Sequence, residues 1–168
     1  MKSFGPNYSR DLLQPAPYQL VALSKLALSG LRGILVCDGV GVGKTITAGY
    51  AASYVSGLGK GPTLVVCPVM LVDKWRGELE FKFGLDARPV RNVEELRTAE
   101  DEIPYLSSSG ASVAYILAQS LLVKPDFSTS IRPSLIIADE IHGYRNPETI
   151  SYRLLHKLCE ASHWRMGL

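Results

Sequence analysis

The sequence predicts an α/β fold in which helices cover both faces of a mostly parallel sheet. Short runs of apolar, often β-branched residues recur along the chain, at residues 33–37, 63–67, 112–117 and 134–138. Continuously apolar runs of this length are typical of parallel strands that are buried on both faces. Helix-like stretches separate them, and alternation of strands and helices indicates right-handed crossovers in a three-layer arrangement.

The expected helices follow these strands in order. They cover residues 44–56, 70–83 and 94–103, with a last amphipathic helix that begins near Ile150. The helix at 70–83 carries Leu71, Trp75 and Leu79 at regular spacing, which predicts one apolar face. The helix at 94–103 is expected to end before Pro104, because proline disrupts a helix interior. Residues 164–168 turn apolar again.

Composition is that of one globular domain covering residues 1–168. The chain is 46% hydrophobic and 20% charged, with a net charge of +2. A domain of this size buries about 70% of the surface that its unfolded chain exposes. No apolar run reaches the roughly 18 to 20 residues that span a bilayer, and the N-terminus lacks the apolar core of a signal peptide, so we expect a cytoplasmic protein without a membrane partner.

Three cysteines are present, Cys37, Cys67 and Cys159. Their wide spacing does not suit a metal site. The first two fall at the ends of predicted strands, where free cysteine behaves as a small hydrophobic residue. We therefore expect packing rather than metal or redox chemistry.

A glycine-rich loop follows the first predicted strand and precedes a predicted helix. Consecutive backbone N–H groups in such a loop point at phosphate oxygens, and the helix adds the positive end of its dipole. Lys44 would then reach the β- and γ-phosphates of ATP, and the Thr45 hydroxyl would ligate Mg²⁺. The loop residues expected to bind phosphate are Gly39, Val40, Gly41, Val42 and Gly43. An ordinary glycine turn before a helix is the alternative interpretation.

The fourth predicted strand ends in two adjacent carboxylates, Asp139 and Glu140, with His142 close behind. Asp139 is suited to holding the Mg²⁺ that bridges the phosphates, and Glu140 to deprotonating the attacking water. The carboxyl ends of parallel strands share one edge of the sheet, so both carboxylates should face the glycine loop. The alternative is purely structural, a helix N-cap followed by a first-turn glutamate.

Residues 139–142, Asp-Glu-Ile-His, resemble the DEAH-type box of superfamily 2 helicases and translocases. The following Gly-Tyr-Arg-Asn at 143–146 resembles the extension found in the Swi/Snf-like branch. In that branch the phosphate loop typically has the sequence D-E-x-G-x-G-K-T. The resemblance thus accounts for Asp38, which stands where the general phosphate-loop pattern G-x-x-x-x-G-K-[ST] has glycine. It also implies that His142 couples the nucleotide site to the nucleic-acid site.

Other segments resemble further motifs of that family, in the expected order. Gln19 would read the adenine edge, as in the glutamine motif. Residues 63–68 with Lys74 and Trp75 resemble a motif on the nucleic-acid path, although Trp75 is more often a core residue in such a stripe. Residues 115–122, with Gln119, match a strand-binding motif only weakly. Residues 164–168 look like the strand that leads into the T-[GA]-T-P coupling motif.

The resemblance implies a RecA-like P-loop NTPase sandwich, and only the first of the two lobes that the family uses. The second lobe would come in cis or in trans. ATP and Mg²⁺ are the implied cofactors, and the backbone of double-stranded DNA is the implied partner. Because the second lobe supplies arginine fingers, we expect the isolated chain to bind nucleotide weakly and to hydrolyse it slowly. The alternatives are a stand-alone nucleotide-sensing or partner-docking module and a small P-loop kinase, which fits the acidic box poorly.

Overall fold

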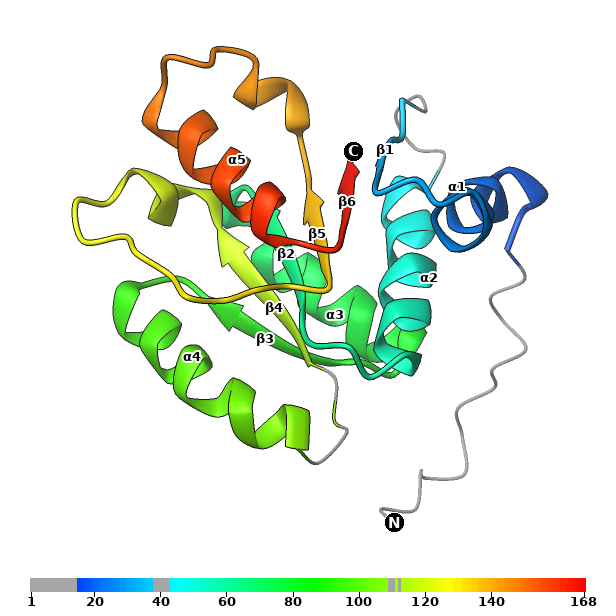
Figure 1. The fold of residues 1–168 in the computed structure, drawn as a ribbon, viewed down its shortest axis with the longest axis horizontal. Coiled ribbons are helices and arrows are strands. Elements are labelled where there is room, and N and C mark those ends of the chain that lie inside the picture. The colour runs from blue at the N-terminus through cyan, green and yellow to red at the C-terminus, as the bar shows by residue number, and fades with distance from the viewer. Residues whose placement is uncertain (1–14, 38–42, 109–110, 112) are drawn as a thin grey trace.

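A computed structural model describes residues 15–37, 43–108, 111 and 113–168. Its centre is a six-stranded sheet in the order β1-β6-β5-β2-β4-β3, in which every pair of neighbouring strands is parallel (Figure 1). The strands are β1 (Gly33–Leu35), β2 (Thr63–Cys67), β3 (Asp86–Val90), β4 (Val113–Ala118), β5 (Leu135–Ala138) and β6 (Trp164–Gly167). The predicted α/β class with a parallel sheet is confirmed.

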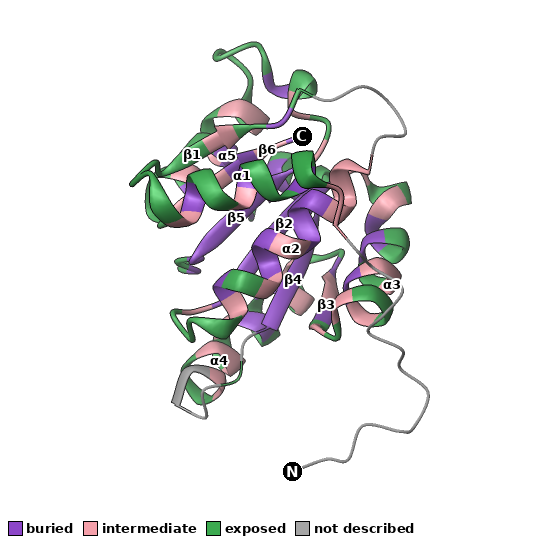
Figure 2. Cartoon of the chain, turned by 90° about the vertical axis from the view of Figure 1, so that its right-hand side faces the viewer, coloured by how far each residue is buried: buried purple, intermediate pink, exposed green. Residues whose placement is uncertain are grey.

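Helices cover both faces of this sheet and complete the three layers. One apolar cluster unites the sheet with α1 (Pro17–Leu28), α2 (Lys44–Gly57) and α3 (Val72–Phe83). A second cluster, on the other face, unites it with α4 (Val93–Ser108) and α5 (Ile150–Ala161). Short 3-10 helices follow three of the strands: η2 (Val69–Leu71), η3 (Gln119–Val123) and η4 (Ile141–Tyr144). The central strands are buried between these layers (Figure 2).

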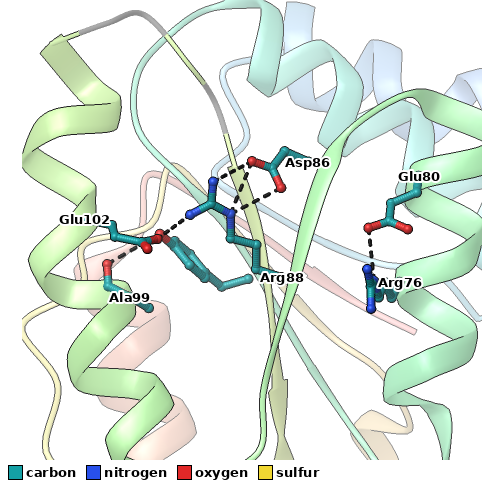
Figure 3. A network of polar contacts seen from close by, with 7 residues as sticks. Arg76, Glu80, Asp86, Arg88, Ala99 and Glu102 are labelled. Atoms are coloured by element: carbon teal, nitrogen blue, oxygen red, sulfur yellow. Dashed lines mark hydrogen bonds and ion pairs between the residues drawn. The ribbon is translucent and has the colours of Figure 1, made fainter.

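One strand of the sheet, β3, was not predicted. Its sequence, Asp-Ala-Arg-Pro-Val, contains two charged residues and a proline, so it lacks the apolar run expected of a parallel strand. It forms because it lies at the edge and pairs with β4 alone, where Pro89 needs no ladder donor on its outer side. The Arg88 guanidinium bonds to the carboxylates of Asp86 and Glu102, which anchors the strand to α4 (Figure 3).

The expectation that the helix at 94–103 ends before Pro104 was wrong. Helix α4 continues to Ser108 with Pro104 inside it. The side chains on either side of the proline, Ile103 and Leu106, pack against the second apolar cluster. Both are partly buried there, and this packing helps to offset a helix-interior proline cost of about 3 kcal/mol.

The cysteines behave differently from one another. Cys67 is buried in the core, as expected, at the end of β2. Cys37 is exposed, so the packing expectation was wrong for it: β1 ends at Leu35, and Cys37 lies beyond the pairing region. In the described ranges, no cluster of histidine, cysteine and carboxylate side chains could hold a metal ion, and no helix is long and apolar enough to cross a membrane.

Helix α2 packs so closely on α3 that Gly49 has no room for a side chain. A Cβ atom there would overlap the ring of Phe83, which itself packs edge-on against Tyr50 at 5.2 Å between centroids. We expect Gly49→Ala to lower the free energy of unfolding by about 1 to 2 kcal/mol, measured by urea denaturation, because overpacking displaces the ring.

Gly57→Ala is the matched control in the same helix, because nothing lies within 4 Å of the added Cβ. It should leave stability unchanged or raise it by up to about 1 kcal/mol through helix propensity. Equal effects of the two substitutions would contradict the close α2–α3 contact.

Candidate active site

The carboxyl ends of β1, β6 and β5 meet at one edge of the sheet and bring the two predicted halves of the site together. The Val36 N–H donates to Gly167 O at 2.9 Å on one side of β6. On the other side, the Leu168 N–H donates to Ala138 O at 2.9 Å, and the Ile141 N–H donates to Leu168 O at 3.1 Å. The end of β6 thus joins the chain that enters the glycine loop to the acidic segment (Figure 1).

The glycine loop ends at Gly43, which is the N-cap of α2. Its φ is +84°, a left-handed conformation that favours glycine. The N–H groups of Ile46 and Thr47 both donate to Gly43 O, so the helix begins directly after the loop. Lys44 and Thr45 occupy its first turn and are partly exposed. The other predicted loop residues, Gly39, Val40, Gly41 and Val42, lie outside the described residues.

Gln19 on α1 lies directly against the end of this loop. Its side chain is only 7% exposed, and its Oε1 accepts a hydrogen bond from the Ala16 N–H at 3.1 Å. A Cβ atom on Gly43 would lie 2.7 Å from Gln19 Nε2, so the amide packs on the backbone of the glycine. The structure therefore brings Gln19 to the predicted phosphate loop, while its role in reading adenine stays a prediction.

Asp139 directly follows β5, and donors from two different elements hold its carboxylate. Oδ2 accepts a hydrogen bond from Trp75 Nε1 at 2.8 Å, and Oδ1 accepts from the Glu140 N–H at 3.0 Å. The Asp139 N–H itself donates to Val66 O at 2.9 Å, which extends the pairing of β5 with β2. The backbone and the side chain of Asp139 are thus both fixed relative to the sheet.

The contact with Trp75 is the part of the site that sequence reasoning missed. The core interpretation of this residue is confirmed, since Trp75 is 2% exposed within the first apolar cluster. Its hydrogen-bond partner lies 64 residues away along the chain, so no local pattern indicated it. Next to this pair, burial raises the pKa of Cys67 to about 12, and the negative charge of Asp139 adds to the effect. The Cys67 thiol is therefore neutral at physiological pH.

Glu140 adopts a left-handed backbone conformation, with φ +53° and ψ +46°. Among the described residues it is the only non-glycine residue with a positive φ. Its side chain is half exposed, and its Oε2 lies 3.2 Å from His142 Nδ1. Neither acid forms a side-chain cap on η4, so the structural alternative of a helix N-cap is not what the chain adopts.

The extension that follows the acidic box contacts the weakly matched segment at 115–122. Tyr144 is buried, and its hydroxyl donates to Gln119 Oε1 at 3.4 Å. Burial raises the pKa of Tyr144 to about 12, so the hydroxyl keeps its proton and its donor role at neutral pH. This long hydrogen bond places Gln119 beside the box.

Arg145 and Asn146 form the turn that leads into α5. Arg145 Nε donates to His142 O at 3.0 Å, and Asn146 Oδ1 accepts from the Glu148 N–H at 3.0 Å. Thr149 then caps the helix by accepting from the Tyr152 N–H. These contacts are sufficient to explain both residues as parts of a turn before a helix.

Comparison with known proteins supports the family resemblance. No protein-family model matches the chain. It is 29% identical over 144 residues to the chromodomain-helicase-DNA-binding protein 1-like of Danio rerio, covering 83% of this chain and 14% of the relative. It is 30% identical over 148 residues to the uncharacterized ATP-dependent helicase YqhH of Bacillus subtilis, covering 87% of this chain and 25% of that helicase. The chain is homologous to proteins of the SNF2 helicase family.

The fold agrees with that of a solved SNF2 protein. The Sulfolobus solfataricus SWI2/SNF2 ATPase core, solved in complex with dsDNA, superposes with a TM-score of 0.72 at 22% identity. The match covers 93% of this chain and 32% of that one. The RecA-like α/β fold predicted from the resemblance is therefore confirmed. The chain spans at most about a quarter of the length of these two curated SNF2 and helicase relatives.

The left-handed conformation of Glu140 should cost stability. A left-handed backbone costs a residue with a Cβ roughly 1 to 2 kcal/mol, which glycine avoids. We expect Glu140→Gly to raise the free energy of unfolding by about 1 kcal/mol in urea denaturation. The control is Glu148→Gly, at an exposed turn position without a positive φ, which should lower stability by about 0.4 to 1 kcal/mol because glycine raises the entropy of the unfolded chain. Destabilisation by both would contradict strain at Glu140.

Proposed function

We propose that this chain is the ATP-binding lobe of a nucleic-acid-dependent ATPase that translocates along double-stranded DNA. The observation that carries the proposal is the two-sided fixation of the Asp139 carboxylate, at the same sheet edge where Gly43 begins α2. An acid held in this way opposite a phosphate loop suits a Mg-nucleotide site. Homology to ATP-dependent helicases supports the same chemistry.

The residues present fit a magnesium nucleotide. Carboxylate and hydroxyl oxygens are the ligands that Mg²⁺ prefers, and Asp139 and Thr45 supply one of each. Lys44 and the N-terminus of α2 add positive charge for the β- and γ-phosphates. When bound, the metal neutralises charge that develops on the transferred phosphoryl group. Gln19, packed on Gly43, takes the adenine edge.

Glu140 serves as the general base in this proposal. Its carboxylate is half exposed and free of the core, so that it is able to reach an attacking water. His142 contacts that carboxylate directly, at 3.2 Å, which gives a route by which the nucleic-acid side of the lobe affects the base. A change at His142 would alter where Glu140 points.

Duplex DNA is the proposed partner. The superposed Sulfolobus ATPase core was solved with dsDNA, and two similar curated proteins are named chromatin remodeling 19 and SWI/SNF-related regulator of chromatin. A lobe of this kind would bind the phosphate backbone of DNA rather than its bases. Binding should therefore weaken with rising salt and depend little on the DNA sequence. A second RecA-like lobe, in cis or in trans, would complete the catalytic cleft with arginine fingers, without which this lobe hydrolyses ATP slowly.

Lys44→Ala should abolish nucleotide binding by this chain, because it removes the side chain expected on the β- and γ-phosphates. Binding is measured by titration with a fluorescent ATP analogue in the presence of Mg²⁺. The control is Lys157→Ala, which removes an exposed lysine of α5 and should leave binding unchanged. Undiminished binding by Lys44→Ala would refute the phosphate-loop assignment.

Glu140→Gln in the full-length protein should retain ATP binding and lose DNA-stimulated hydrolysis. Removing a positioned general base typically lowers the rate by about 10² to 10⁴. The measurement is phosphate release with and without duplex DNA, alongside Glu148→Gln as a control for the loss of an exposed carboxylate. Normal turnover by Glu140→Gln would exclude the general-base role.

A further inference from the structure

We propose that Trp75 is a positioning residue for the metal site, and that its indole N–H holds the Asp139 carboxylate in the orientation that Mg²⁺ requires. This inference rests on the proposed function, since Asp139 is taken as the metal ligand. It goes further by assigning a role at the metal site to a residue that the apolar stripe of α3 marks as a core residue. The evidence is the 2.8 Å hydrogen bond from Trp75 Nε1 to Asp139 Oδ2.

The indole N–H has little access to solvent. Trp75 is 2% exposed, so water cannot easily replace Asp139 as the acceptor. A buried donor that loses its partner is costly, and a charged acceptor makes the bond stronger than a neutral one. The bond should therefore persist throughout nucleotide binding and release.

The carboxylate is fixed at both of its oxygens. Oδ2 takes the indole N–H of α3, and Oδ1 takes the Glu140 N–H. Rotation about the side-chain torsions of Asp139 would break at least one of these bonds. Each oxygen still has acceptor capacity for a metal ion or a metal-bound water. Without Trp75, the adjacent Glu140 amide would be the one remaining donor to the carboxylate among the described residues.

The indole is itself held rigidly. Val72 and Leu79, on the same helix, are both fully buried in the first apolar cluster. Because Trp75 is itself buried in this cluster, a different orientation of the ring would require the cluster to repack. Orientation of a metal-ligating carboxylate by a fixed donor of this kind is how outer residues tune a metal site.

Helix α3 also connects this bond to the molecular surface. It begins directly after η2, where Val69 and Met70 are 52% and 86% exposed. The preceding strand, β2, contacts the box through Val66, whose carbonyl accepts the Asp139 N–H. A ligand that displaces η2 and α3 would thus shift the indole and, through it, the carboxylate of Asp139.

The test removes the N–H without changing the shape of the side chain. Benzothienylalanine replaces tryptophan at residue 75 in a Trp164→Phe background, so that only one position carries the analogue. The dissociation constant of a fluorescent ATP analogue is measured with Mg²⁺ and again with excess EDTA. The ratio of the two constants reports the metal contribution alone. Trp75→Phe is the genetically encoded companion variant, and Trp164→Phe alone is the matched control.

We expect Asp139→Asn to bring the metal ratio close to one and Trp164→Phe to leave it at the wild-type value. Benzothienylalanine at residue 75 and Trp75→Phe should each lower the ratio by about ten-fold, because loss of a residue that orients a metal ligand typically has an effect of this size. Nucleotide binding in EDTA should be unchanged. Combined with Asp139→Asn, the Trp75 change should have no further effect on the ratio.

The positioning role would be overturned if Asp139→Asn lowers the ratio of the two dissociation constants but the protein with benzothienylalanine at residue 75 keeps the wild-type ratio. Equal weakening of binding with and without Mg²⁺ would also overturn it, because that is the signature of a purely structural residue. A wild-type chain that binds no nucleotide, or whose binding is insensitive to Lys44→Ala, would instead refute the proposed function. The two failures are therefore distinguishable.

Discussion

The pairing of β6 with both β1 and β5 is the constraint on which the rest of this structure depends. It is made of parallel backbone ladders that end at Gly167, and it continues on either side through the bonds of Val36 and Ile141. Because all three strands run in the same direction, their carboxyl ends open at one edge. Val36, which precedes the glycine loop, and Asp139 in the acidic box are separated by about a hundred residues, and this pairing brings them to the same edge.

The two apolar layers give that edge its rigidity. Helices α1, α2 and α3 share one apolar cluster with the sheet, and Trp75 belongs to that cluster. Gln19 reaches Gly43 from α1, and Trp75 reaches Asp139 from α3. The same helices therefore serve both purposes, because those that exclude water from the sheet also orient the side chains at its edge. The left-handed backbone of Glu140 persists because the surrounding pairing of Asp139 and Ile141 holds both of its neighbours.

Much of the fold was predictable, because most of its strands are apolar runs and most of its helices carry an apolar stripe. Strand β3 was not, since Pro89 and its charged neighbours are compatible with a strand only at an edge, and edge position is a property of the whole sheet. Pro104 was misinterpreted for a related reason: the cost of a proline is local, whereas the burial of Ile103 and Leu106 that offsets it is not.

By itself the sequence determined the fold class and the family resemblance, and it predicted the residues proposed to bind phosphate, hold a metal or transfer a proton, because each depends on residue types at short spacing. Tertiary structure alone decided that Gln19 packs on the last glycine of the loop, that Glu140 takes a left-handed backbone, and that Trp75 holds Asp139. The contacts of Gln19 and Trp75 join residues far apart in the chain, and the backbone of Glu140 is held by the pairing of its neighbours. They arise only when parallel pairing and helix burial bring the segments together, and no local pattern encodes a distance of that kind.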